Sequence, residues 1–213
     1  MNKRRMLLLA LAVFVSVTAS GCGYNTLQSK HQNVRAKWSG VESQLQRRAD
    51  LIPNLVAAAQ SVAVQEQEVF GQIAEARSRL LNAASAQPQG ESGDKTPEQK
   101  QAVIDANNSF GGTIGRLLSL TESYPQLRSN ENFMKLQDEL TGTENRIATS
   151  RNDYNTAVQD YNTTRGSFPT VIGAKIYGFK EEPYFQAEEG ARQAPKPADP
   201  NSLRRNQGNT NAK

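Results

Sequence analysis

Apolar residues recur along most of the chain at alternating steps of three and four, which places their side chains on one face of an α-helix. Four segments carry such a seam. The seam positions are Leu27, Val34, Trp38, Val41 and Leu45; then Leu55, Ala59, Val62, Glu66, Val69, Ile73, Ala76 and Leu80; then Val103, Asn107, Phe110, Ile114, Leu117, Thr121 and Tyr124; and last Phe133, Leu136, Leu140, Thr143, Ile147, Ser150, Tyr154, Ala157 and Tyr161. A helix with one narrow seam must bury it against other helices. The pattern predicts an all-α protein, an antiparallel four-helix bundle with long helices in up-down-up-down order.

Local turn and cap signals separate the last three segments. Residues 83–97 are small, polar and rich in Gly and Pro, which is typical of an exposed connection. The sequence Thr96-Pro97-Glu98-Gln99 offers a capping box and a proline at the first helical position, so the third helix is expected to start there. Residues 124–130 interrupt the third seam, and Ser129 or Asn130 is placed to cap the fourth helix.

The connection between the first two segments, RRADLIPNLV at 47–56, contains Pro53. Proline has no amide hydrogen, so it is costly inside a helix but suits the first turn of one. We therefore predict that the first helix ends near Arg48, where a cation complements the helix dipole. The second helix would begin around Pro53, with Asp50 just before it. One long helix kinked at Pro53 is the alternative.

The first 21 residues have the composition of an export signal. A basic start at positions 3–5 is followed by an apolar run from Met6 to Val17. As a helix this run would span about 18 Å, which is short of the roughly 30 Å hydrocarbon core of a bilayer. The segment 1–21 is therefore predicted to be a cleaved signal peptide.

The signal segment ends at Ala19-Ser20-Gly21-Cys22, which resembles a bacterial lipobox. Cys22 is the only cysteine of the chain, so no disulfide can form within it. We predict that Cys22 is lipidated and tethers the protein to a membrane of the cell envelope. Because Gly23 and not Asp follows, the outer membrane, on its periplasmic side, is expected in a Gram-negative host. An uncleaved signal anchor is the alternative.

Charge is distributed so that no basic face is expected on the folded part. The chain has 25 Lys and Arg against 21 Asp and Glu, but residues 22–190 hold 17 basic and 20 acidic side chains. A nucleic-acid-binding protein needs a clustered basic surface, so nucleic acid is excluded as a partner. The Pro-rich, basic and aromatic-free segment 187–213 is predicted to be a disordered tail, which leaves 22–186 as one helical domain.

The residues needed for common catalytic chemistries are scarce. His31 is the only histidine, and no Glu lies three residues before it, whereas dinuclear metal sites in bundles use two Glu-x-x-His pairs. Acyl transfer usually needs a histidine base or a free thiol. We therefore expect no enzymatic activity, no metal and no cofactor.

Polar residues on or beside the seams predict a polar layer inside the bundle, made of Glu66, Glu144 and Arg151. A buried carboxylate must be paired or hydrogen-bonded, or else it becomes neutral. The layer is interpreted as a buried ion pair that specifies helix register. A proton or ligand site is one alternative, and a Glu66 side chain turned to the rim is another.

Five stretches of the chain resemble the LemA family. They are YNTL at 24–27, RRADLIPNLV at 47–56, EARSRL at 75–80, YPQLRSNENFMKLQDELTGTENRIATSRNDYNTAVQDYN at 124–162, and FPTVIGAKIYGF with YF at 168–185. The resemblance covers nearly all of residues 24–185, and its block from 124 to 162 is highly specific. It implies an all-α four-helix bundle held to a bacterial membrane by its N-terminus.

Together these features predict a non-enzymatic envelope lipoprotein that serves as a scaffold or binding module for another envelope component. The alternative is an accessory or regulatory subunit of a membrane protease or a cell-wall enzyme. In up-down-up-down order, the turns at 47–54 and 124–130 would share the end remote from the membrane. We predict a docking surface there, and the alternative is that its residues only cap helices and close the bundle. The docking surface would consist of Arg47, Arg48, Asp50, Asn54, Arg128 and Asn130.

Overall fold

The computed structural model describes residues 3–90 and 93–185, and over this part the chain is all-helical, as predicted. The predicted tail, 187–213, lies outside the described residues. Cys22 is part of a helix, but its side chain lies outside the described part. No helix among the described residues is long and apolar enough to cross a membrane.

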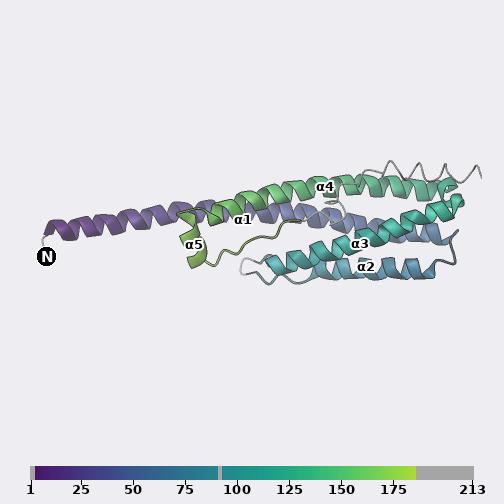
Figure 1. The fold of residues 1–213 in the computed structure, drawn as a ribbon, viewed down its shortest axis with the longest axis horizontal. Coiled ribbons are helices and arrows are strands. Elements are labelled where there is room, and N and C mark those ends of the chain that lie inside the picture. The colour runs from purple at the N-terminus through teal and green to yellow at the C-terminus, as the bar shows by residue number, and fades with distance from the viewer. Residues whose placement is uncertain (1–2, 91–92, 186–213) are drawn as a thin grey trace, which may run out of the picture.

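Four long helices, one short helix and one 3-10 helix make up the described chain. They are α1 (Lys3–Gln60), α2 (Gln67–Ser85), α3 (Pro97–Ser123), η1 (Pro125–Ser129), α4 (Glu131–Gly166) and α5 (Thr170–Ile176). Helix α1 packs mainly on α4, and α2 packs mainly on α3 (Figure 1). The first part of α1 extends alone beyond the other helices, and α5 lies across the long axis where α1 leaves them (Figure 1).

The predicted seams form one continuous core. Burying a large aliphatic or aromatic side chain contributes about 1.5–3 kcal/mol, so a seam of several such residues holds each helix in place. The buried seam residues include Val34, Trp38, Val41 and Leu45 of α1, Ile73 and Leu80 of α2, Phe110, Ile114 and Leu117 of α3, and Phe133, Leu140 and Ile147 of α4.

Helix α1 continues through Pro53, so the predicted turn at 47–54 is wrong and the alternative of one long helix holds. The proline deprives the carbonyl of Ala49, four residues earlier, of its helical donor. Arg77 of α2 supplies the missing bond, because its Nε donates to Ala49 O at 2.7 Å. A second guanidinium nitrogen of Arg77 lies 3.7 Å from Asp50 Oδ1. The segment around Pro53 is therefore a contact between two helices.

The chain turns instead at residues 61–66, inside the second predicted seam. The amides of Val62 and Ala63 both bond to Ala59 O, at 3.1 and 2.9 Å, which closes α1. The Ser61 hydroxyl donates to Ala58 O at 2.7 Å, and such side-chain bonds compete with helix propagation. The predicted second helix is thus divided between the end of α1 and α2.

Both helix starts predicted from cap chemistry are confirmed. Thr96 and Gln99 form a reciprocal capping box at the start of α3, with Pro97 in its first turn. Asn130 caps α4, and its Oδ1 accepts from the Phe133 amide at 3.1 Å. These signals are local, so neighbouring residues suffice to predict them.

Candidate functional site

The chain after α5 returns along α4 as an extended segment, here called the strap (residues 180–185). Two buried tyrosines of α4 hold its carbonyls. Tyr161 donates its hydroxyl hydrogen to Lys180 O at 2.7 Å, and Tyr154 donates to Pro183 O at 2.9 Å. Burial, followed by the negative charge of Glu182, raises the pKa of both tyrosines far above the ordinary value of 10.0. Both therefore stay neutral hydroxyl donors near neutral pH.

Two asparagines of α4 bind the strap backbone on both its donor and its acceptor side. The Asn162 amide donates to Glu182 O at 2.9 Å, and Asn162 Oδ1 accepts from the Glu182 N–H at 3.1 Å. Asn155 does the same for Phe185, with 3.0 and 2.8 Å. Each asparagine side chain thus satisfies a main-chain donor and acceptor that would otherwise need a neighbouring strand.

These contacts come from a repeated tetrapeptide, Asp-Tyr-Asn-Thr, at 153–156 and 160–163. The repeats are seven residues apart on α4, while the strap residues that they hold are three apart. Seven helical residues rise about 10.5 Å and three extended residues about 10 Å, so the two spacings match. The repeat is therefore in register with an extended chain.

The aspartates of the same repeats bind α4 to α1. Asp153 lies 3.0 Å from Lys37 Nζ, and Asp160 lies 2.5 Å from Lys30 Nζ. The two lysines are also seven residues apart, so they meet the two repeats in order. The four side chains are between 28% and 57% exposed, and such pairs contribute little each. The two ion pairs help to keep α1 and α4 aligned beside the strap.

A buried ionic cluster joins the strap to α3 and α1. Lys100, near the start of α3, is fully buried, and its Nζ donates to Glu182 Oε2 at 2.7 Å. The other carboxylate oxygen of Glu182 lies 3.1 Å from His31 Nε2 of α1. Glu182 therefore meets two side chains that reach it from two different helices.

Opposing effects act on the ionisation of Glu182. Its burial raises the pKa, but the hydrogen bond from His31 and the attraction and hydrogen bond of Lys100 lower it. The lowering effects win, so the pKa of Glu182 lies below its ordinary value of 4.5. The carboxylate is thus charged at neutral pH and stays matched with the Lys100 ammonium.

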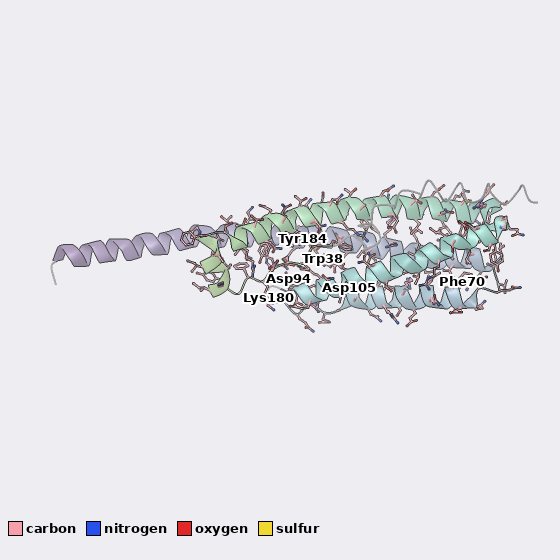
Figure 2. The ribbon with its side chains drawn as sticks, in the orientation of Figure 1. Trp38, Phe70, Asp94, Asp105, Lys180 and Tyr184 are labelled. Carbon is pink, nitrogen blue, oxygen red and sulfur yellow. The ribbon has the colours of Figure 1, made fainter. Side chains whose placement is uncertain are left out.

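The connection between α2 and α3 brings a second carboxylate to this cluster. Asp94 Oδ2 lies 3.4 Å from Arg35 Nε and 3.9 Å from His31 Nε2. Gly90 lies against it: Gly90 N bonds to Asp94 O at 2.9 Å, and a Cβ on Gly90 would lie 2.6 Å from Asp94 Oδ1. Gly93 adopts φ 71°, which favours glycine. Figure 2 shows both Asp94 and Lys180 near the start of α3.

A pocket of about 440 Å³ lies over the cluster. Its polar lining includes His31, Asp94, Lys95 and Glu182, and its aromatic lining includes Tyr161. Among residues 3–90 and 93–185, no group of three or more His, Cys, Asp or Glu side chains is placed to hold a metal ion. Polar groups of the pocket bond to one another and to side chains behind it: Glu182 contacts His31 of α1 and Lys100 of α3. The arrangement thus joins three segments.

The predicted docking surface is not assembled, because its first half lies on the side of the molecule. Arg47 Nη2 lies 3.1 Å from Glu139 of α4. Arg48 is buried, and Asp50 accepts a hydrogen bond from Gln46 at 3.0 Å. Since α1 continues past Pro53, Arg48 stands about 18 Å before the end of this helix.

The second half of that surface lies at the end of the molecule. Arg128 is exposed in η1, and Asn130 caps α4. Asn54 is exposed on α1. The convergence predicted for the six residues was derived from a turn at Pro53, and it fails with that turn.

The predicted polar layer is also wrong in its membership. Glu144 does enter a buried contact, but its partner is Arg48, whose Nε lies 2.7 Å from Glu144 Oε1. Arg48 Nη1 donates to Asn107 Oδ1 at 2.9 Å, and its guanidinium carbon lies 5.4 Å from the ring centroid of Phe110. This cluster connects α1, α3 and α4.

Glu66 and Arg151 lie in two other places. Glu66 precedes α2 and accepts a hydrogen bond from the Tyr124 hydroxyl at 2.9 Å. Arg151 of α4 stacks over Phe185 of the strap, with its guanidinium carbon 4.3 Å from the ring centroid. The prediction placed these residues together because they lie on or beside the seams. In the structure, the turn at 61–66 puts Glu66 at a helix end.

The strap and the pairing of Lys100 with Glu182 were not predicted from the sequence. The Asp-Tyr-Asn-Thr repeat was a usable signal, because residues seven positions apart lie on the same face of a helix and can contact the same neighbouring segment. Nothing comparable marks Lys100 or Glu182, which lie 82 positions apart in the chain. Their pairing depends on the path of the strap.

Comparison with known proteins places this architecture in a family. The sequence model of the LemA family matches residues 37–197. The chain belongs to the LemA family. The resemblance found in the sequence is thereby confirmed, and the matched range contains the Pro53 contact, both repeats and the strap.

Two similar proteins of Paramagnetospirillum magneticum are magnetosome proteins MamQ 1 and MamQ 2. Each is 30% identical over 193 residues, which is 85% of this chain and 71% of the relative. Magnetosome protein MamQ of Magnetospirillum gryphiswaldense is 28% identical over 187 residues, covering 82% of this chain and 69% of the relative. This LemA-family chain is thus similar to these relatives over most of its length.

Proposed function

We propose that this LemA-family protein is a non-enzymatic, membrane-tethered envelope protein that acts as a scaffold or binding module. The observation that carries the proposal is the continuity of α1, which runs for 58 residues from Lys3 to Gln60. It joins Cys22, the proposed point of attachment, to the helical body as one helix. The part from Gly23 to Gln60 alone rises about 57 Å, so the helical body is elongated and is attached at one end by a short tether.

Three further points support a structural role over a catalytic one. The two helix pairs are interpreted as one antiparallel four-helix bundle, which offers long, exposed helix faces to partners. The charged groups of the ionic cluster bind one another and so fix the strap to α1 and α3. The relatives are named for a cellular structure, the magnetosome, and their names state no reaction.

Lipidation of Cys22 is the proposed form of the tether, with the outer membrane as the destination in a Gram-negative host. Mass spectrometry of the protein extracted from membranes should find an acylated Cys22 at the mature N-terminus. Cys22→Ser should lose this modification, while Ser20→Ala, which keeps a small residue before the cysteine, should retain it. An intact Met1 terminus in the membrane fraction would contradict lipidation and favour a signal anchor.

Photo-crosslinking in cells tests the binding role. Crosslinkers at Val64, in the turn after α1, and at Asp138, on the exposed face of α4, sample two surfaces of the helical body. A scaffold should give reproducible adducts with structural envelope components. Adducts dominated by one protease or cell-wall enzyme would favour the role of a regulatory subunit. Absence of adducts at both positions in properly localised protein would contradict a binding module.

A further inference from the structure

An apolar patch lies at the end where α1 leaves the other helices. Seven large hydrophobic side chains are exposed in the described part of the chain, and five of them gather there. We call these five the end patch. They are Tyr24, Phe168, Ile172, Ile176 and Tyr177. Phe168 is 82% exposed and Ile176 is 72% exposed. Single exposed hydrophobics are ordinary, but a cluster of large ones marks a surface that another phase or molecule covers.

The end patch surrounds a groove between α5 and α1. The groove has a volume of about 380 Å³, and Gly23, Leu27, Ala174 and Phe179 complete its lining. Apolar atoms dominate these walls. Helix α5 therefore presents a hollowed apolar surface to the outside, although one of its sides is fixed to the molecule by buried Ala174.

The position of the end patch relative to the apolar run of α1 identifies what covers it. From Val17, where the run ends, to Gly23, which lines the groove, α1 rises only about 9 Å. The interfacial zone on each side of a roughly 30 Å hydrocarbon core is about 5–8 Å thick. A membrane that receives the run, or an acyl chain on Cys22, thus brings its headgroup layer to the level of α5.

We propose that the end patch is seated on the phospholipid bilayer, with α5 lying in the headgroup layer. The exposed phenylalanine and isoleucine side chains enter the boundary of the acyl chains, and the tyrosines stay at the interface that such rings prefer. This inference rests on the proposed membrane tether and adds a second, non-covalent contact to it. The body is then held at two points and stands in a fixed orientation.

Depth-dependent fluorescence quenching tests the contact. The Ile176→Trp protein, extracted from membranes with its natural N-terminus, is reconstituted into phosphatidylcholine–phosphatidylglycerol vesicles whose acyl chains carry bromine. The matched control is Val64→Trp, because Val64 is also exposed, at 63%, but lies in the turn at the other end of α1. Phe168→Trp gives a second reporter on the patch. Native Trp38 is buried in the core and supplies the background signal, which the unsubstituted protein measures.

We expect at least a twofold loss of the added emission at position 176 or 168, a shift of that emission to shorter wavelength, and no loss at position 64. Unquenched emission at both patch positions in protein that floats with the vesicles would overturn the inference while leaving the tether intact. Failure to float would overturn the tether and the inference together. A shorter-wavelength emission without quenching, in particles with the mass of a dimer, would show that a second copy covers the patch and would also overturn it.

Discussion

Glu182 is a single carboxylate on which three segments of the chain converge. Its backbone is held by Asn162 of α4, and its side chain meets Lys100 of α3 and His31 of α1. The attraction within a buried ion pair must offset the loss of hydration of both charges. Glu182 is therefore more important for the location of the strap than for net stability.

Neutralising Glu182 should be costly because its partner stays behind. In Glu182→Gln the buried Lys100 ammonium loses its counter-ion, and we expect the free energy of unfolding to fall by about 3–5 kcal/mol. The double variant Lys100→Met/Glu182→Gln should recover part of this loss. Urea denaturation followed by circular dichroism measures both. A cost no larger than that of Glu75→Gln, a change at an exposed carboxylate of α2, would contradict the role given to Glu182.

The same carboxylate predicts an acid-sensitive component of stability. Because the pKa of Glu182 is lowered in the fold, the unfolded chain takes up the proton at higher pH than the folded chain does. Its contribution is therefore complete above the ordinary pKa of 4.5 and disappears as the pH falls through the folded value. Unfolding free energies measured from neutral to about pH 3 should decline less steeply for Glu182→Gln than for the parent. Equal slopes would contradict the prediction.

The element that departs most from expectation is α1. Proline costs roughly 3 kcal/mol inside a helix when nothing compensates it. Here Arg77 of α2 donates to the carbonyl that Pro53 leaves unpaired, so a distant residue reverses the local preference. The stretches RRADLIPNLV and EARSRL thus act as one contact between two helices.

A double-mutant cycle measures this coupling. We expect Arg77→Ala to lower the free energy of unfolding by about 1.5–3 kcal/mol in the parent, because a buried carbonyl loses its only charged donor. In a Pro53→Ala background the restored N–H can serve the Ala49 carbonyl, so the cost of Arg77→Ala should be smaller. The difference between the two costs is the coupling energy. Arg79→Ala, at an exposed arginine two positions away, serves as the control, and strictly additive effects would contradict the proposed contact.

At this scale, a feature could be predicted from the sequence when the residues that interact lie close together in the chain. The seams and the caps at Thr96 and Asn130 involve neighbours in the chain, and their positions were predictable. The turn at Pro53, the docking surface and the polar layer were misplaced because Arg77 and the turn at 61–66 decide the path of α1 and α2. In the sequence, the only sign of the strap site was the Asp-Tyr-Asn-Thr repeat, and nothing in the repeat identifies residues 180–185 as its partner.

Across the whole molecule, the helices form two pairs with close backbone packing, and the two pairs share one core of buried side chains. The closest backbone packing is that of α1 with α4 and of α2 with α3. Side chains link the pairs at separate points, among them Arg48 with Asn107 and Lys95 with Glu42. Parts of a protein whose backbones pack less closely on one another can open separately.

Hydrogen exchange should therefore resolve two units. We expect amides of α2 and α3, such as those of residues 73–80 and 110–117, to exchange before those of residues 38–45 in α1 and 147–154 in α4. Native-state exchange followed by mass spectrometry at increasing urea concentration measures the order. Arg48→Met removes the link between Arg48 and Asn107, so it should make the amides of α3 exchange earlier. Its effect on residues 147–154 of α4 should be smaller. Simultaneous exchange in all four helices would instead indicate one cooperative unit.

The carbonyl of Ala49 has a further consequence, for alignment. Heptad-like seams return similar apolar contacts when one helix slides past another by two turns, so they distinguish such positions poorly. Only one placement of α2 sets Arg77 against the Ala49 oxygen, and any other leaves that acceptor without its donor, at a cost of about 1–3 kcal/mol. The placement of α2 also decides where the connection after it reaches, and so whether Asp94 meets His31 and Arg35. Because Pro53 has no amide hydrogen, the Ala49 carbonyl favours a single alignment of α2 against α1. The position of the ionic cluster depends on this alignment.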